Sequence, residues 1–243
     1  MKLAITLTTY NRPHLTWMLL ERISLQARIL GHDLSFFVID DHSDIGKHIY
    51  DLYENTFIGF PIYIAVNEEN QGKSGHWKTV NRILEFLKAR DFDYVVYLQD
   101  DLDPIPTFLR SLIDQYEAID DPDKVCLNYV LEESRNGVQC WTPGQPERVN
   151  YNGYDLWKVG WVELHFIANR KFFEALDWKV EKPRRPFGKD KSKLSSGVGD
   201  YISHKLYDQG LGMYQVTKSL ARHGHVPSLM NPEERKINPL RSI

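Results

Sequence analysis

The sequence lacks any apolar stretch of about 18 residues, the length that a membrane-spanning helix needs. It also lacks a leader with a charged start and a small-residue cleavage site. We therefore expect neither membrane spanning nor secretion, and a cytoplasmic protein. Cysteine is scarce as well: Cys126 and Cys140 have no metal-type spacing, so we expect reduced structural thiols.

Strong charge of one sign is also missing, because the net charge is −3 and the pI is near 6.3. This balance argues against a protein that coats nucleic acid non-specifically, although it leaves room for a local basic patch. Internal repeats and low-complexity segments are absent. With 243 residues, of which 42% are hydrophobic, the chain is long enough to bury the core of one α/β domain.

The first half of the chain alternates apolar, β-branched runs with segments of helical periodicity. Strands are predicted at residues 2–9, 34–39, 61–66 and 94–99, and helices at residues 14–27, 45–53, 76–89 and 107–119. Four β-α units at this spacing predict an α/β fold with a doubly wound, mostly parallel sheet and right-handed crossovers.

The second half is less regular and richer in aromatic residues. We expect a strand at 124–131, a loop-rich segment at 132–154 and a strand at 159–168. The predicted elements that follow are a helix at 170–176, a helix at 199–209 and a last strand at 213–216. One domain is expected, with a first half at 1–120, a second half at 121–230 and a tail at 231–243.

Three carboxylates follow the most apolar predicted strand, Tyr94–Gln99, within four residues: Asp100, Asp101 and Asp103. The carboxyl end of a parallel strand is where open α/β sheets bind ligands, and carboxylates this close repel one another unless a cation or solvent compensates them. A divalent-metal site is one interpretation. A solvated acidic turn that caps the next helix is the other, since Asp103-Pro104 can begin a helix.

Four motifs fall at the predicted carboxyl edge of the sheet: Thr8–Pro13 (TTYNRP), Asp40-Asp41, Asn70–Gly72 and Gln99–Pro104 (QDDLDP). In order and spacing they resemble the nucleotide-sugar-dependent glycosyltransferases of the GT-A fold, particularly family 2. The resemblance covers about the first 120 residues, and it implies a nucleotide-sugar-binding half at 1–120 and an acceptor-binding half at 121–230. It implies an enzyme that moves a sugar from a nucleoside-diphosphate sugar to an acceptor hydroxyl, with Mn²⁺ or Mg²⁺ bound to the diphosphate.

The resemblance also implies where the donor binds. The nucleotide-sugar site would comprise Thr8, Thr9, Tyr10, Arg12, Asp40, Asp41, Asn70, Gly72, Lys73, Gln99 and Asp100. Metal ligands would come from Asp101, from Asp103 and, through a Gly-His-Val segment, from His225, with His223 second. Hard carboxylate oxygens suit Mn²⁺ or Mg²⁺, which would stabilise charge on the leaving diphosphate.

Two departures from the family pattern concern the metal motif and the glycine loop. When Pro104 and Pro106 are aligned with the family's prolines, Gln99 replaces the first aspartate of the DxD motif and Asp101 is the last. Asp101 and Asp103 form an alternative DxD, so Asp101 belongs to both registers. Asn81 follows the Gly72 loop later than the corresponding asparagine usually does.

Candidate acceptor-side residues lie in the second half. Asp200, in Gly197-Val198-Gly199-Asp200, matches the segment whose aspartate is the base in inverting members, although an acidic residue near a helix N-terminus is also favoured by the dipole alone. Trp161 and Glu163 would lie beside the acceptor, where an aromatic face can stack on a sugar or base. Core packing explains Trp161 equally well.

The segment Lys179–Lys193 is rich in basic residues, among them Arg184 and Arg185, and directly precedes the proposed base. Such runs usually form solvated loops. The alternative is a clamp on a phosphate-bearing acceptor, including hydroxymethylated pyrimidines in phage DNA. Two other classes compete: a sugar-phosphate nucleotidyltransferase, disfavoured because TTYNRP has no glycine, and a non-catalytic GT-A module that binds nucleotide. The sugar, the nucleobase and the oligomeric state are not predicted.

Overall fold

The computed structural model describes residues 1–44, 59–131, 145–182 and 197–223. Its main feature is a nine-stranded sheet in the order β3-β2-β1-β4-β9-β6-β10-β8-β7. A second sheet contains only β5 (Leu102–Pro104) and β11 (Ala221–His223), which pair antiparallel. No helix within the described ranges is long and apolar enough to cross a membrane.

The first four strands are parallel, as predicted. They are β1 (Lys2–Thr9), β2 (Asp33–Asp40), β3 (Ile62–Val66) and β4 (Tyr94–Gln99), with α1 (Pro13–Leu30) after β1 and α3 (Gly72–Lys88) after β3. The chain runs outward from β1 to β3 and then returns to place β4 on the other side of β1. This reversal is a topological switch point, where the carboxyl ends of neighbouring strands open a crevice.

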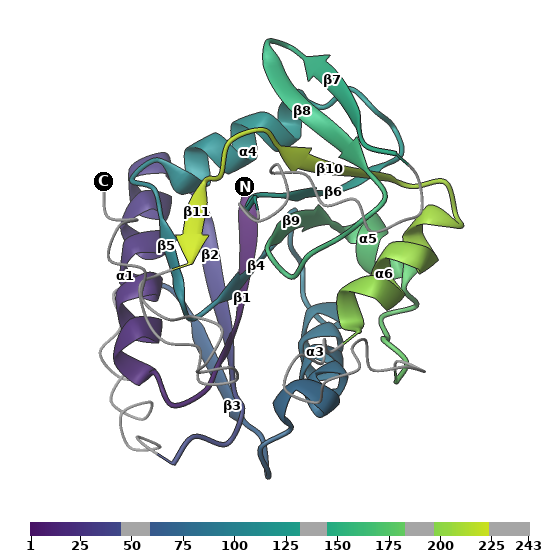
Figure 1. Ribbon diagram of the computed structural model, residues 1–243. Helices are drawn as coiled ribbons and strands as arrows, with labels where there is room; N and C mark the ends of the chain where they lie inside the picture. The colour runs from purple at the N-terminus through teal and green to yellow at the C-terminus, as the bar shows by residue number, and fades with distance from the viewer. Residues whose placement is uncertain (45–58, 132–144, 183–196, 224–243) are drawn as a thin grey trace, which may run out of the picture.

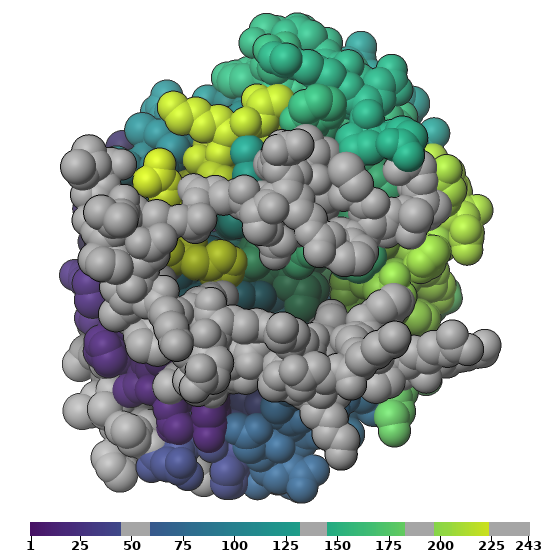
Figure 2. All heavy atoms as spheres, viewed as in Figure 1, coloured from purple at the N-terminus to yellow at the C-terminus, as the bar shows by residue number. Residues whose placement is uncertain are grey.

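The second half mixes parallel and antiparallel pairs. Its sheet strands are β6 (Lys124–Asn128), β7 (Glu147–Tyr151), β8 (Tyr154–Val159), β9 (Phe166–Asn169) and β10 (Gly212–Val216), and its helices are α4 (Phe108–Ala118), α5 (Arg170–Ala175) and α6 (Val198–Tyr207). β9 is antiparallel to both β4 and β6, so it joins the two halves into one sheet. The β7–β8 hairpin projects from one end of the molecule, as Figures 1 and 2 show.

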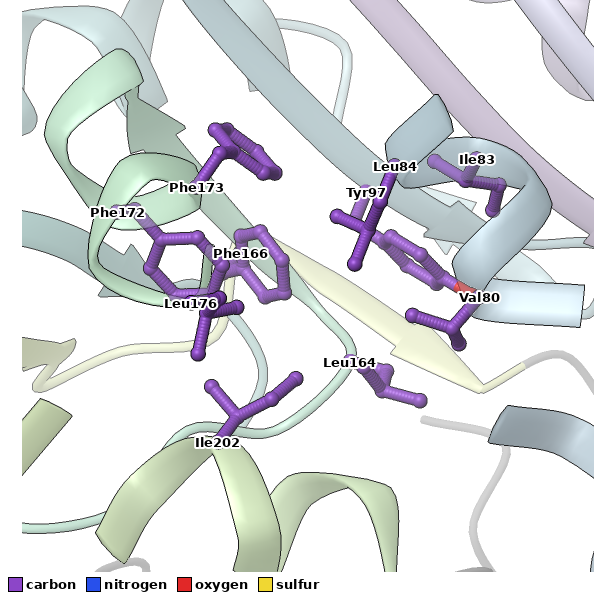
Figure 3. Close-up of a pocket in the computed structure, with 10 residues that line it drawn as sticks. All are labelled: Val80, Ile83, Leu84, Tyr97, Leu164, Phe166, Phe172, Phe173, Leu176 and Ile202. Atoms are coloured by element: carbon purple, nitrogen blue, oxygen red, sulfur yellow. The ribbon is translucent and has the colours of Figure 1, made fainter. Parts of the chain in front are cut away.

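Helices cover both faces of the sheet (Figure 1). On one face α1 and α4 bury residues such as Leu20, Ile23 and Leu112 against β1, β2 and β4. On the other face α3, α5 and α6 pack against the sheet through residues such as Ile83 and Phe172. Figure 3 shows a small pocket between these helices and the sheet, lined by apolar side chains and by Tyr97 of β4. The mostly parallel, doubly wound α/β architecture is therefore confirmed.

Several predictions for individual elements were wrong. The segment 132–154 was predicted to be loop-rich, but β7 occupies Glu147–Tyr151, and a hairpin turn at Asn152-Gly153 leads into β8. The strand predicted at 159–168 is a loop followed by the shorter β9. The short strands β5 and β11 were not predicted. The helix predicted at 45–53 lies outside the described residues.

Candidate functional site

The candidate site lies at the carboxyl ends of β1 and β4, which are neighbours at the switch point. Thr8 of β1 is in register with Gln99 of β4, so the motifs that follow the two strands start side by side. The register brings TTYNRP and QDDLDP together, as the sequence predicted. The carboxylates that follow β4 then take three different roles.

Asp100 supports the loop that follows β1. One of its carboxylate oxygens accepts hydrogen bonds from Thr9 Oγ1 at 2.9 Å and from the backbone N–H of Tyr10 at 3.2 Å. The other accepts from Nη1 of Arg12 at 3.1 Å. Burial raises the pKa of Asp100, and the Arg12 charge and these hydrogen bonds oppose that rise. With three donors on one carboxylate, Asp100 acts chiefly to shape the loop.

Asp101 is as deeply buried as Asp100 but faces different groups. Its Oδ1 lies 3.3 Å from Nδ1 of His223, and its Oδ2 lies 3.7 Å from Nη1 of Arg12. Its side chain is 7% exposed, and that of His223 is 30% exposed. A carboxylate oxygen and an imidazole nitrogen therefore converge at a partly open position.

Asp103 lies on the exposed side of β5, where Leu102 and Pro104 on either side of it are buried. Its carboxylate pairs with Arg22 of α1, and its side chain is 65% exposed. Successive side chains of a strand point to opposite faces. The structure thus groups Asp101 with His223, and it groups Asp103 with the surface of α1.

His223 reaches the site through the pairing of β11 with β5. Ala221 is in register with Pro104 and His223 with Leu102, which places the histidine beside the acidic motif. The ring of buried His165 lies behind it, with ring centroids 5.1 Å apart in an edge-to-face arrangement. His225, the first-choice histidine of the sequence prediction, lies outside the described residues.

The two aspartates after β2 also differ. Asp40 is buried and accepts a hydrogen bond from the backbone N–H of Ser43 at 2.6 Å. Asp41 accepts from the backbone N–H groups of Gln71 at 2.9 Å and Gly72 at 3.0 Å, where α3 begins. Backbone N–H groups in the first turn of a helix have no intrahelical acceptor. Asp41 therefore caps α3 from a neighbouring loop.

Asn67, which the sequence interpretation did not single out, connects these loops. Its Nδ2 donates to Asp41 at 2.7 Å and to Thr79 Oγ1 at 3.0 Å, and its Oδ1 accepts from Nη1 of Arg82 at 2.5 Å. Asn67 is buried directly after β3. A polar residue directly after an apolar strand was the signal that could have identified it.

His76 lies in α3 near the same acidic group. Burial lowers the pKa of His76 to about 4, and the negative charge of Asp41 only partly opposes this shift. The side chain is therefore neutral near pH 7. It places a neutral imidazole in α3, beside the Gly72 turn.

The acceptor-side candidates gather around the N-terminus of α6. Gly199 packs so closely on the loop after β8 that an added Cβ would lie 2.8 Å from the carbonyl oxygen of Val162 and 3.5 Å from the ring of Trp161. The indole N–H of Trp161 donates to Glu163 at 2.7 Å. Asp200, in the first turn of α6, pairs with His204 at 3.5 Å. Trp161, Glu163 and Asp200 therefore belong to one packed unit.

The remaining candidates are less enclosed. Thr8, Tyr10, Gly72, Lys73 and Gln99 are partly buried, and Asn70 is exposed. Arg184 and Arg185 lie outside the described residues. Gly72 has a positive φ of 54°, which favours glycine at this turn.

The donor chemistry of the Asp101–His223 pair fits a divalent cation. Carboxylate oxygen suits Mg²⁺ and Mn²⁺, and imidazole nitrogen is a common partner for transition metals. Within the described ranges no group of three or more His, Cys, Asp or Glu side chains forms a metal cluster. Among the described residues the pair would supply two ligands to such a cation, and substrate oxygens or water would fill other positions.

No protein-family model matches the sequence, and no curated protein matches it. Solved structures match its fold. S. aureus TarS residues 1–349 in complex with UDP has a TM-score of 0.58 at 17% identity, with 91% of this chain and 60% of that chain covered. GalNAc-T7 with UDP, GalNAc and Mn²⁺ has a TM-score of 0.60 at 13% identity, with coverages of 88% and 41%.

A mannosyltransferase from Pyrobaculum calidifontis in complex with GDP-Man and Mn²⁺ has a TM-score of 0.54 at 16% identity, with 89% of this chain and 54% of that chain covered. This chain thus spans between about two fifths and three fifths of these three proteins. At such identities the likeness concerns the fold alone. The chain has the GT-A fold of nucleotide-sugar glycosyltransferases.

Proposed function

We propose that the protein is a metal-dependent glycosyltransferase that moves a sugar from a nucleoside-diphosphate sugar to an acceptor hydroxyl. The observation that carries this proposal is the 3.3 Å approach of Asp101 and His223 at the switch-point crevice of a GT-A sheet. A carboxylate that follows β4 and an imidazole of β11, 122 residues apart in the sequence, converge where such sheets bind ligands.

Asp101 and His223 would hold Mn²⁺ or Mg²⁺. When bound, the cation supplies positive charge to the leaving diphosphate. Arg12 and Asp100 hold the loop after β1 in place at the same crevice. Thr8, Tyr10 and Gln99 are partly exposed at the ends of β1 and β4 and are proposed donor contacts.

The donor nucleotide would lie between the loops after β1 and β2. Asp40 and the Asp41–Gly72 connection are proposed to border it, with Asn70 and Lys73 at its outer side. Asp41 already accepts two backbone N–H groups, which supports a role in fixing the loop that faces the nucleotide. The solved neighbours carry UDP in two cases and GDP-Man in another, so we propose a nucleoside diphosphate sugar without assigning the base.

Asp200 is the proposed general base, which would remove the proton of the acceptor hydroxyl and give inversion at the sugar. Its support is its position in the first turn of α6, beside the Trp161–Glu163 unit. The indole of Trp161 is held by Glu163 and would offer an apolar face to the acceptor. A general base must lie within hydrogen-bond reach of the proton that it removes.

The acceptor is proposed to be a hydroxyl compound that bears phosphate, with DNA as one form of it, and a cytoplasmic setting would suit it. This part depends on the basic residues of segment 179–193, most of which lie outside the described ranges. Neutralising Arg184, Arg185, Lys189 and Lys191 together would remove salt-sensitive binding to duplex DNA. Absence of DNA binding by the unmodified protein at low salt would leave a small phosphate-bearing acceptor.

Calorimetry with UDP and GDP, each with and without Mn²⁺, tests the donor half of the proposal. One nucleotide is expected to bind at least tenfold more tightly with Mn²⁺. The variant Asp200→Asn, assayed for transfer and hydrolysis with the sugar nucleotides of the base that binds, should keep that affinity and lose at least 100-fold in kcat. Metal-independent binding, or none, would contradict a metal-dependent enzyme, and retained turnover would place the base elsewhere.

A further inference from the structure

Arg12 is a buried cation between the two buried acids. Its Nη1 lies 3.1 Å from Oδ1 of Asp100 and 3.7 Å from Oδ2 of Asp101. The three side chains are 10%, 11% and 7% exposed, so water screens their interaction weakly. Two adjacent carboxylates repel each other unless a nearby positive charge compensates them. Arg12 supplies that charge from within the chain.

The backbone fixes the position of this guanidinium. Arg12 immediately precedes α1, and its carbonyl oxygen accepts the backbone N–H of Thr16 at 3.0 Å. The preceding residue, Asn11, has a positive φ of 53° and donates its backbone N–H to Ser43 Oγ at 2.7 Å. Because both sides of Arg12 are anchored, its side chain is directed at the acidic pair by the fold.

The two carboxylates hold the guanidinium unequally. Asp100 makes the closer contact and also accepts from Thr9 and Tyr10, so it is fixed in place. Asp101 lies farther from Arg12 and faces His223. If Asp101 binds another cation, Arg12 can remain hydrogen-bonded to Asp100. Asp101 is thus the carboxylate that can bind a metal, and Asp100 is the one that holds Arg12.

Building on the glycosyltransferase function above, we propose that Arg12 is a positioning residue that competes with the divalent cation for Asp101 and makes metal binding depend on the nucleotide. An arginine cannot lose its charge in a protein, so a metal ion at Asp101 meets a fixed positive charge. The diphosphate brings negative charge that offsets this repulsion. The coupling is reciprocal: the metal favours the nucleotide as strongly as the nucleotide favours the metal.

The competition between Arg12 and the cation can be tested without an activity assay. The electron paramagnetic resonance signal of free Mn²⁺ measures how much Mn²⁺ the protein binds. Titrations at pH 8 compare the unmodified protein with Arg12→Gln, each with and without UDP or GDP. Arg12→Gln should bind Mn²⁺ roughly tenfold more tightly without nucleotide, and the gain from nucleotide should shrink by a similar factor. Arg22→Gln, which removes an exposed cation from Asp103, is the matched control and should change neither value more than about twofold.

Mn²⁺ affinity that is unchanged or weaker in Arg12→Gln, in protein with a native circular dichroism spectrum, would overturn the competition. If that variant does not fold, Arg12→Lys replaces it. A compact ammonium reaches one carboxylate at a time, so we expect tightening of roughly two- to fivefold, and an unchanged or lower affinity would overturn the inference. An unmodified protein that binds neither Mn²⁺ nor UDP nor GDP would instead remove the proposed function and, with it, this inference.

Discussion

Asp101 and His223 are 122 residues apart in the chain, yet Oδ1 of the aspartate lies 3.3 Å from Nδ1 of the histidine. The pairing of β5 with β11 creates this contact, because it places His223 opposite Leu102, the residue after Asp101. Asp103, only two residues from Asp101, points instead to Arg22. The acidic motif therefore divides into one carboxylate that faces the crevice and one that faces the surface.

A matched pair of variants tests this division. Asp101→Asn removes the carboxylate that faces His223, so Mn²⁺-dependent nucleotide affinity should fall at least tenfold, since a neutral amide is a poor ligand for a hard cation. Asp103→Asn removes a charge of an exposed ion pair and should change that affinity by less than about twofold. Calorimetry with UDP or GDP in the presence of Mn²⁺ measures the nucleotide affinity of each variant. Equal losses in the two variants would contradict the assignment of Asp101.

The capping role of Asp41 predicts an effect on stability. Its two oxygens accept the first backbone N–H groups of α3 and the side chain of Asn67. Asp41→Asn keeps the size but loses the charge and one acceptor, so the free energy of unfolding should fall by about 1–2 kcal/mol. Urea denaturation measures the change. The exposed Asp44 of the same loop is the control: Asp44→Asn should cost less than about 0.5 kcal/mol.

The elements predicted best are those whose signal is local. The apolar run Tyr94–Gln99 was predicted as the fourth strand and is β4, with the same bounds. Helix α3 was predicted to begin near His76 but begins at Gly72. A glycine in a polar segment indicates a turn, whereas the capping by Asp41 that starts the helix there is a tertiary contact. Local pattern could not reveal it.

The parts of the site that sequence did not predict depend on short elements. β5 and β11 have three residues each, too few for any periodicity, and their pairing determines which histidine meets Asp101. The β7–β8 hairpin did carry a local signal, since Asn152-Gly153 between two strands is typical of a tight turn. Both residues have positive φ, at 51° and 88°, as such a turn requires.

His76 predicts how stability depends on pH. Burial lowers its pKa to about 4 in the folded protein, from an ordinary value of 6.5 in the unfolded chain. Between pH 6.5 and 4 the unfolded chain therefore binds more protons at this site, so stability should fall as the pH is lowered through this window. His76→Gln has no such proton and should show a shallower decline in urea unfolding measured from pH 7 to 4.5. Parallel pH profiles for the two proteins would mean that His76 does not contribute.

The close contact at Gly199 predicts a change at the proposed base. A Cβ at this position would lie 2.8 Å from the carbonyl oxygen of Val162, and a backbone atom cannot move aside as a side-chain end can. Gly199→Ala should therefore shift the first turn of α6 and Asp200 with it, and a misplacement of that kind costs about 100-fold in rate. Steady-state kinetics should show the loss in kcat, with the affinity for UDP or GDP and Mn²⁺ unchanged.

The matched control for Gly199 is Gly75, a glycine in the first turns of α3. An added Cβ there would lie 2.9 Å from both Cβ and Oε1 of Gln71, so it also meets a close contact, but one within α3 and its N-cap and not on α6. Gly75→Ala should therefore introduce a comparable close contact without moving the first turn of α6, and kcat should stay within about twofold. If Gly199→Ala retained full kcat, the packing of α6 on the Val162 loop would not position Asp200. If both variants lost activity equally, the loss would come from replacing a helical glycine by alanine and not from the contact with Val162.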